Sequence, residues 1–133
     1  MVTSNYPVSH QVVTKIAKIT RTDTSAKELF QIPAGALITD VRVFSPAVSD
    51  AGTTAVVSVG DGSSATKYLD TVDVKSAAGM IRPTSKLANA LTAVALGYES
   101  IFGIYAETGT ASTVGTFYVI LEYIHVGPGE IIN

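Results

Sequence analysis

Between residues 37 and 44 the side chains alternate with a period of two. One set is apolar or β-branched, and the other carries both charges of the segment. Because side chains alternate between the faces of a β-strand, this pattern predicts a strand with one face packed on a second layer and the other facing water or a partner. Pro33 and Gly35 just before it predict a turn. The two sets are Leu37, Thr39, Val41 and Val43, and Ile38, Asp40, Arg42 and Phe44.

Six other segments also have the composition of strands. They are rich in valine, isoleucine and threonine, and turn residues bound them. Residues 26–32 fit a helix or a strand by propensity, but their shortness and the Pro33 that follows favour a strand. Gly103 is a candidate bulge within its segment. The predicted strands span residues 12–22, 26–32, 54–60, 66–74, 98–107 and 115–126.

The last of these segments is apolar on both faces, which is typical of a central strand with contacts on each side. Its two faces are Phe117, Val119, Leu121 and Tyr123, and Tyr118, Ile120, Glu122 and Ile124. Seven or eight short strands with turns at near-regular spacing predict an all-β protein. We therefore expect an antiparallel β-sandwich of about eight strands.

The rest of the chain is less regular. Residues 1–11 are polar and broken by Pro7, which predicts an extended arm or a disordered tail. Residues 76–96 are compatible with a short helix capped by Ser85 and with an alanine-rich loop. Residues 127–133 predict a tail, which leaves a single domain over residues 12–126.

Charged residues make up only 15% of the 133 residues, compared with roughly a quarter in soluble domains. The shortage predicts a surface covered partly by hydroxyl groups and partly by another subunit. The net charge of −2 argues against a general nucleic-acid binder. One short segment does gather basic residues, and we interpret it as a solvated strand face rather than a binding patch: Lys15, Lys18, Arg21 and Lys27.

The chain has no cysteine, which excludes a disulfide or a thiolate metal site. It has no run of 18 apolar residues that could span a membrane. The first ten residues lack the basic and apolar regions of a signal peptide. We therefore expect that the protein is made and starts inside a cell. A protein that is assembled into a larger particle inside a host cell would have the same sequence features.

No motif predicts catalysis. The glycine-containing segment at residues 59–64 lacks the lysine of a phosphate-binding loop and the acidic spacing of a calcium loop, so a hairpin turn is expected. Asp70 and Asp73 are predicted on opposite faces of a strand, which argues against a paired acid and base. His10 and His125 lie far apart, and no nucleophile motif accompanies them. We expect no enzyme, no metal and no cofactor.

The aromatic residues suggest contact surfaces rather than a sugar site. Stacked rings would suit a lectin-like site, but the chain lacks tryptophan. Tyrosine combines an apolar ring with a hydroxyl that tolerates water, which suits an intersubunit face. We therefore assign Phe30, Phe44, Phe102 and Phe117 to the core. The predicted oligomer or capsid contacts are Tyr6, Tyr98, Tyr105, Tyr118, Ile120 and Ile124.

The segments IPAGALITDV, VSVGDG and GTFYVILEY, which lie within residues 16–124, resemble small virion proteins of tailed bacteriophages. In that group an IPAGA turn and strand lead into VSVGDG, and a strand alternating with valine and tyrosine comes near the end. The resemblance implies a jelly-roll domain, often trimeric, that decorates or cements the capsid or belongs to a head fibre or tail appendage. Such proteins have no catalytic residues.

This resemblance implies a homotrimer bound to the major capsid protein on the virion surface, assembled in the host cytoplasm, with no nucleic acid or membrane as partner. The alternative is a carbohydrate- or receptor-binding module of a fibre or tail. The two functions predict different surfaces. A sugar binder should show rings at a loop-rich end, whereas a cement protein should show apolar area on a sheet face or in the arm.

Overall fold

The computed structural model describes residues 12–81 and 99–125, and within these ranges every regular element is a strand. No helix there is long and apolar enough to cross a membrane. The strands are β1 (Val12–Thr20), β2 (Lys27–Ile32), β3 (Ala36–Ser45), β4 (Thr54–Gly60), β5 (Leu69–Asp73), β6 (Gly79–Ile81), β7 (Glu99–Thr108) and β8 (Thr116–His125).

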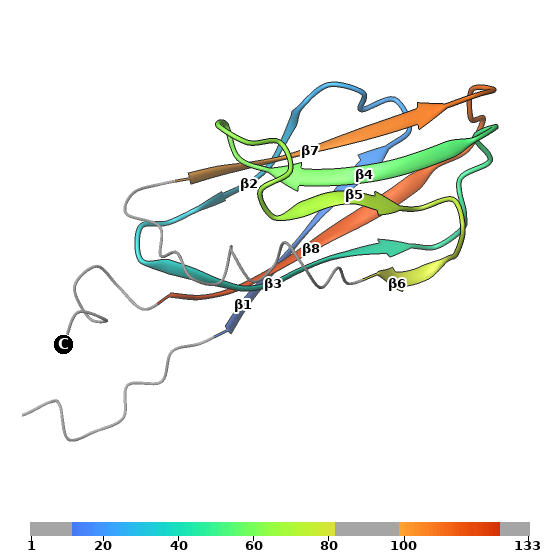
Figure 1. The fold of residues 1–133 in the computed structure, drawn as a ribbon. Coiled ribbons are helices and arrows are strands. Elements are labelled where there is room, and N and C mark those ends of the chain that lie inside the picture. Colours follow the sequence, from blue (N-terminus) through green and yellow to red (C-terminus); the bar gives the residue numbers. More distant parts are fainter. Residues whose placement is uncertain (1–11, 82–98, 126–133) are drawn as a thin grey trace, which may run out of the picture.

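The strands form two four-stranded sheets that pack face to face (Figure 1). Sheet A has the order β1-β8-β3-β6, and sheet B has the order β2-β7-β4-β5. All pairings are antiparallel, and β1 pairs with β8, β2 with β7, β3 with β6, and β4 with β5. The first strand thus pairs with the last, the second with the seventh, and so on inward. A long antiparallel ribbon folded into two sheets around a core has this order of pairs, which is the topology of a jelly roll. The predicted antiparallel β-sandwich is confirmed.

The alternation predicted for residues 37–44 is wrong at its beginning. A bulge lies between Ile38 and Asp40, so Thr39 is the extra residue of β3. Leu37 and Ile38 therefore exchange faces relative to the prediction, because one inserted residue shifts the side-chain alternation by one position. Ile38 faces the core and is 3% exposed, while Leu37 is only half-buried.

Strand positions otherwise follow the prediction closely, with three differences. The strand predicted at residues 66–74 is shorter, since β5 begins only at Leu69. β6 was not predicted, and it lies in the segment that the pattern left open. The bulge predicted at Gly103 occurs instead on the neighbouring strand β2, between Glu28 and Phe30. A β-carbon at Gly103 would lie 2.4 Å from Ile19 Cδ1, so the Ile19 side chain would have to shift.

The core lies between the two sheets and contains two of the four predicted phenylalanines. Phe117 on sheet A is fully buried and stacks on Tyr105 of sheet B, with ring centroids 5.6 Å apart. Phe30 is also buried. Phe44 is 37% exposed and Phe102 is half-buried, both on outer faces, so their assignment to the core is wrong. Both residues occupy positions in their strands whose side chains point outward, and the hydrophobicity of phenylalanine alone does not predict the face.

Several predictions fall outside the described residues. They are the arm at residues 1–11, the helix or loop after Ser85, the tail at residues 127–133, His10, Tyr6 and Tyr98. His125 ends β8, but its side chain is not described.

Candidate functional site

The outer face of sheet A carries four of the large apolar residues that are exposed in the described part of the chain, namely Val12, Ile16, Phe44 and Met80. We define it by the outward side chains of its four strands, which line up across the sheet in rows given by the strand register. The lysine row is Lys18, Tyr118, Phe44 and Met80. The isoleucine row is Ile16, Ile120 and Arg42. The carboxylate row is Thr14, Glu122 and Asp40, and the last row is Val12, Ile124 and Leu37.

Large apolar side chains on this face are unusually exposed. Ile16 is 63% exposed, Val12 is 55% exposed and Met80 is 52% exposed. Phe44 and Tyr118 lie beside each other with ring centroids 6.4 Å apart. Contiguous exposed apolar surface of this kind marks an interaction site in proteins that do not aggregate.

An ion cluster lies in the middle of this face. Arg42 Nη1 donates to Asp40 Oδ2 and lies 3.8 Å from Glu122 Oε2. The Thr39 hydroxyl at the bulge donates to the Glu122 carbonyl oxygen at 3.2 Å, and it lies 3.4 Å from Glu122 Oε1. Asp40 and Arg42 are largely buried, whereas the Glu122 side chain is 31% exposed. Glu122 therefore remains accessible to a cation outside the chain.

A second polar cluster joins the loops at one end of the sandwich. The buried Tyr105 hydroxyl lies 2.9 Å from Ser49 Oγ and donates to Glu107 Oε1 at 2.8 Å. The backbone N–H and the hydroxyl of Ser112 both donate to Glu107, and these bonds lower the pKa of Glu107. Arg21 Nη1 donates to the Ser112 carbonyl oxygen at 3.0 Å. Each of these groups has a partner within the cluster, which indicates a structural role.

Asp50 fastens the β7–β8 loop to the β3–β4 loop. Its carboxylate accepts the N–H groups of Thr113 at 2.9 Å and Val114 at 3.1 Å, together with the Thr113 hydroxyl. The hydroxyl bond and the N–H bonds lower the pKa of Asp50 to about 2, from 3.8. The charged carboxylate is therefore the form that holds the two loops together.

We predict that the Asp50→Asn variant will lose less stability in acid than the wild type. The folded pKa of Asp50 lies below its unfolded value, so its contribution is complete above about pH 4 and is lost as pH falls through about 2. Thermal melting at pH 7, 4, 3 and 2 measures this. Thr113→Ala removes only the hydroxyl donor and should give an intermediate acid dependence. Identical acid dependence for Asp50→Asn and wild type would contradict the assignment.

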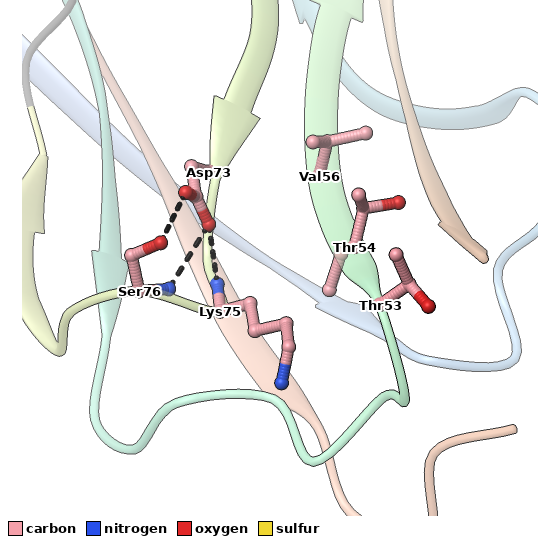
Figure 2. Close-up of a pocket in the computed structure, with 7 residues that line it drawn as sticks. Thr53, Thr54, Val56, Asp73, Lys75 and Ser76 are labelled. Atoms are coloured by element: carbon pink, nitrogen blue, oxygen red, sulfur yellow. Dashed lines mark hydrogen bonds between the residues drawn. The ribbon is translucent and has the colours of Figure 1, made fainter. Parts of the chain in front are cut away.

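A shallow pocket lies over one end of β4 and β5 on the outer side of sheet B (Figure 2). Asp73 provides its carboxylate, but that group already accepts the N–H groups of Lys75 and Ser76 and the Ser76 hydroxyl. These bonds lower the pKa of Asp73. The Lys75 ammonium extends away from Asp73 in Figure 2. This arrangement is a capped turn.

The prediction that Asp70 and Asp73 point to opposite faces of a strand is wrong. Thr71 has a positive φ of 49°, and the register of β5 shifts there, so Leu69 and Val72 are both buried although they are three residues apart. Both aspartates are exposed as a result.

The turn expected within residues 59–64 is present, as part of a longer connection between β4 and β5. Asp61 accepts the N–H groups of Ser63 and Ser64, and the Lys67 ammonium donates to it at 2.9 Å. Despite the cost of partial burial, these hydrogen bonds lower the pKa of Asp61. Asp61 thus closes the loop with its own neighbours.

The structure separates the predicted contact residues into different environments. Tyr118, Ile120 and Ile124 share the outer face of sheet A. Tyr105 is 0% exposed between the sheets, so its prediction as a contact residue is wrong. Tyr105 lies on a central strand and alternates inward, and its hydroxyl finds buried partners in Ser49 and Glu107.

Sequence reasoning missed the contribution of β1 to this face. Val12, Ile16 and Lys18 lie on its outward side, and a two-residue alternation from residue 12 would have identified them. The basic segment around them does not act as one patch. Lys15, Arg21 and Lys27 donate to backbone carbonyl oxygens of this chain. Lys18 is exposed and projects from the outer face of sheet A.

No family model matches the chain, and no curated protein sequence matches it. Solved structures that share its fold include chains from three phage capsids. A chain in the capsid asymmetric unit of cyanophage Pam1 matches with a TM-score of 0.70 and 20% identity, over 93% of this chain and 96% of that one. A chain in the acid-stable capsid of Helicobacter pylori bacteriophage KHP30 matches with a TM-score of 0.65 and 14% identity, over 87% and 90%. A chain in the capsid of Ralstonia phage GP4 matches with a TM-score of 0.60 and 19% identity, over 92% and 90%.

Proposed function

We propose that this chain is a structural, non-catalytic virion protein of a tailed bacteriophage that decorates or cements the capsid shell by bridging neighbouring capsomers. The observation that carries the proposal is the shared fold with chains from three phage capsids, over at least 87% of this chain and 90% of each of those. Such coverage of both chains means that the matched chains are of nearly the same length as this one.

The proposed working unit is a homotrimer on the outer surface of the shell, in contact with the major capsid protein and assembled in the host cytoplasm. A protein in this position acts by adhesion. Symmetry repeats each contact many times, so many weak contacts give a large avidity. The exposed apolar residues on the outer face of sheet A supply surface for such contacts.

The distribution of aromatic rings favours this function over carbohydrate binding. A sugar site needs exposed rings gathered at a loop-rich end. Among the described residues the rings with appreciable exposure are Phe44, Phe102 and Tyr118, and all three lie on strands. The loop tyrosine Tyr68 is 2% exposed and donates to Glu99 at 2.6 Å. Of the six large apolar residues that are exposed in the described part of the chain, four lie on the outer face of sheet A, whereas Val48 and Val114 lie in loops. Most of the apolar exposure therefore follows a sheet face, as expected for a cement protein.

Cryo-electron microscopy of purified particles that contain this protein tests the proposal. We expect density for a small β-sandwich on the outside of the shell, at positions that touch more than one capsomer. A particle assembled without the protein should show the same shell without that density and should break at a lower temperature. Density at a tail tip or fibre would contradict the proposal and favour receptor binding.

A further inference from the structure

We infer that the outer face of sheet A binds a second copy of this chain, and that Lys18 of one copy pairs with Glu122 of the next. The inference deepens the proposed function, on which it rests for its biological setting, by naming the surface that joins the subunits. Its evidence is the arrangement of apolar and charged side chains on four neighbouring strands.

The first step is the apolar surface. Ile16, Val12 and Met80 are each more than half exposed, and they lie on the two edge strands of sheet A. Between them, β8 adds Tyr118 and Ile124, which are half-buried. The apolar surface thus extends across the whole sheet. Burial of such surface provides the main driving force for association.

The second step is the order of the charges. The lysine row carries one positive side chain, Lys18, and the carboxylate row carries two negative ones, Asp40 and Glu122. Arg42 lies in the isoleucine row between them and pairs mainly with Asp40. The face as a whole has two positive and two negative side chains, so its net charge is zero. The Lys18 ammonium pairs with no described carboxylate.

The third step is symmetry. The isoleucine row lies between the lysine row and the carboxylate row. If a rotation axis runs along the isoleucine row, rotation by half a turn or by a third of a turn places the lysine row of one copy against the carboxylate row of the next. Lys18 then meets Glu122, which is accessible with 31% of its side chain exposed. The same rotation places isoleucine row beside isoleucine row. A surface that carries its own complement in this way fits another copy, since closed oligomers are built from such contacts.

Light scattering coupled to size-exclusion chromatography tests this inference on the full chain. We expect the wild type to be an oligomer, and Ile16→Glu to weaken association by tenfold or more because it places a carboxylate in the isoleucine row, which lies beside its own copy in the proposed interface. Lys18→Glu and Glu122→Lys should each weaken association by about tenfold, since like charges then face each other. The double variant Lys18→Glu/Glu122→Lys should restore association to within about threefold of the wild type.

Two controls match these variants. Ala106→Glu introduces the same charge as Ile16→Glu at an exposed position on the outer side of sheet B, and Lys75→Glu reverses a lysine outside the face. Both should leave the oligomer intact. Circular dichroism verifies folding, and Ile16→Ser replaces Ile16→Glu if the charged variant does not fold. A serine at this exposed position should also weaken association.

Three results would overturn the inference. A monomeric wild type at all concentrations would mean that another part of the chain or the shell covers this face. An Ile16→Glu oligomer as stable as the wild type would exclude the face, and a double variant that stays dissociated would exclude the Lys18–Glu122 pair. A monomer that still binds shells would leave the proposed capsid role standing and contradict only the homotrimer, whereas an oligomer that binds no shell would contradict the capsid role alone.

Discussion

Replacing Phe117 with alanine will lower the free energy of unfolding by about 3–5 kcal/mol, the usual loss when a buried phenylalanine is truncated. Phe117 is 0% exposed and stacks on Tyr105 across the two sheets. The deletion leaves a cavity between layers that the antiparallel ladders hold at a fixed spacing, so the site collapses poorly. Chemical denaturation monitored by circular dichroism at fixed protein concentration measures the loss.

Phe102→Ala is the matched control for this prediction. Phe102 is half-buried on the outer side of sheet B, so its removal exposes less apolar surface and creates no enclosed cavity. We expect a loss of about 1 kcal/mol, roughly half of what full burial of a phenylalanine provides. Equal losses for Phe117→Ala and Phe102→Ala would show that the core does not lie between the sheets as described.

Replacing Gly60 with alanine will be the second severe change, with a loss of about 2–3 kcal/mol or failure to fold. A β-carbon at Gly60 would lie 1.9 Å from the carbonyl oxygen of Ser64, far inside van der Waals contact. That carbonyl accepts the N–H of Asp61 at 2.9 Å, so the whole β4–β5 connection would have to move. Thermal melting and the yield of folded protein measure the effect.

Gly62→Ala, two residues further along, is the matched control. A β-carbon at Gly62 would meet nothing within 4 Å. Alanine there restricts the unfolded chain and has no contact to lose, so stability should stay within about 1 kcal/mol of the wild type or increase slightly. A variant Gly62→Ala as unstable as Gly60→Ala would mean that the loop follows a different path.

The candidate site could be predicted only in part. The two apolar faces of β8 are visible in the sequence, and they correctly placed Tyr118, Ile120 and Ile124 on one side of a central strand. Tyr105 was assigned to a contact surface because tyrosine is common at interfaces. Its burial depends on Ser49 and Glu107, which satisfy its hydroxyl, and Ser49 comes from a loop 56 residues away. The sequence around Tyr105 gives no indication that Ser49 will lie beside its hydroxyl.

The bulge at Thr39 is a second feature of the site that the sequence did not predict. A bulge leaves no strong signal in the sequence, because an inserted residue looks like any other member of an alternating strand. In the fold the bulge makes Leu37 face outward and places Asp40 of β3 opposite Glu122 of the neighbouring strand β8. The ion cluster at the centre of sheet A therefore depends on a register that only the paired strands fix.

The sequence by itself determined that this protein is an all-β sandwich, where most of its strands lie, and that β8 is central, because alternation, β-branched content and turn residues act over a few neighbouring positions. The tertiary structure alone decided which outward residues of four strands, from Val12 to Ile124, form one face with opposed rows of charge. That arrangement depends on the winding of the ribbon and the register of its pairs, which arise from contacts between distant segments.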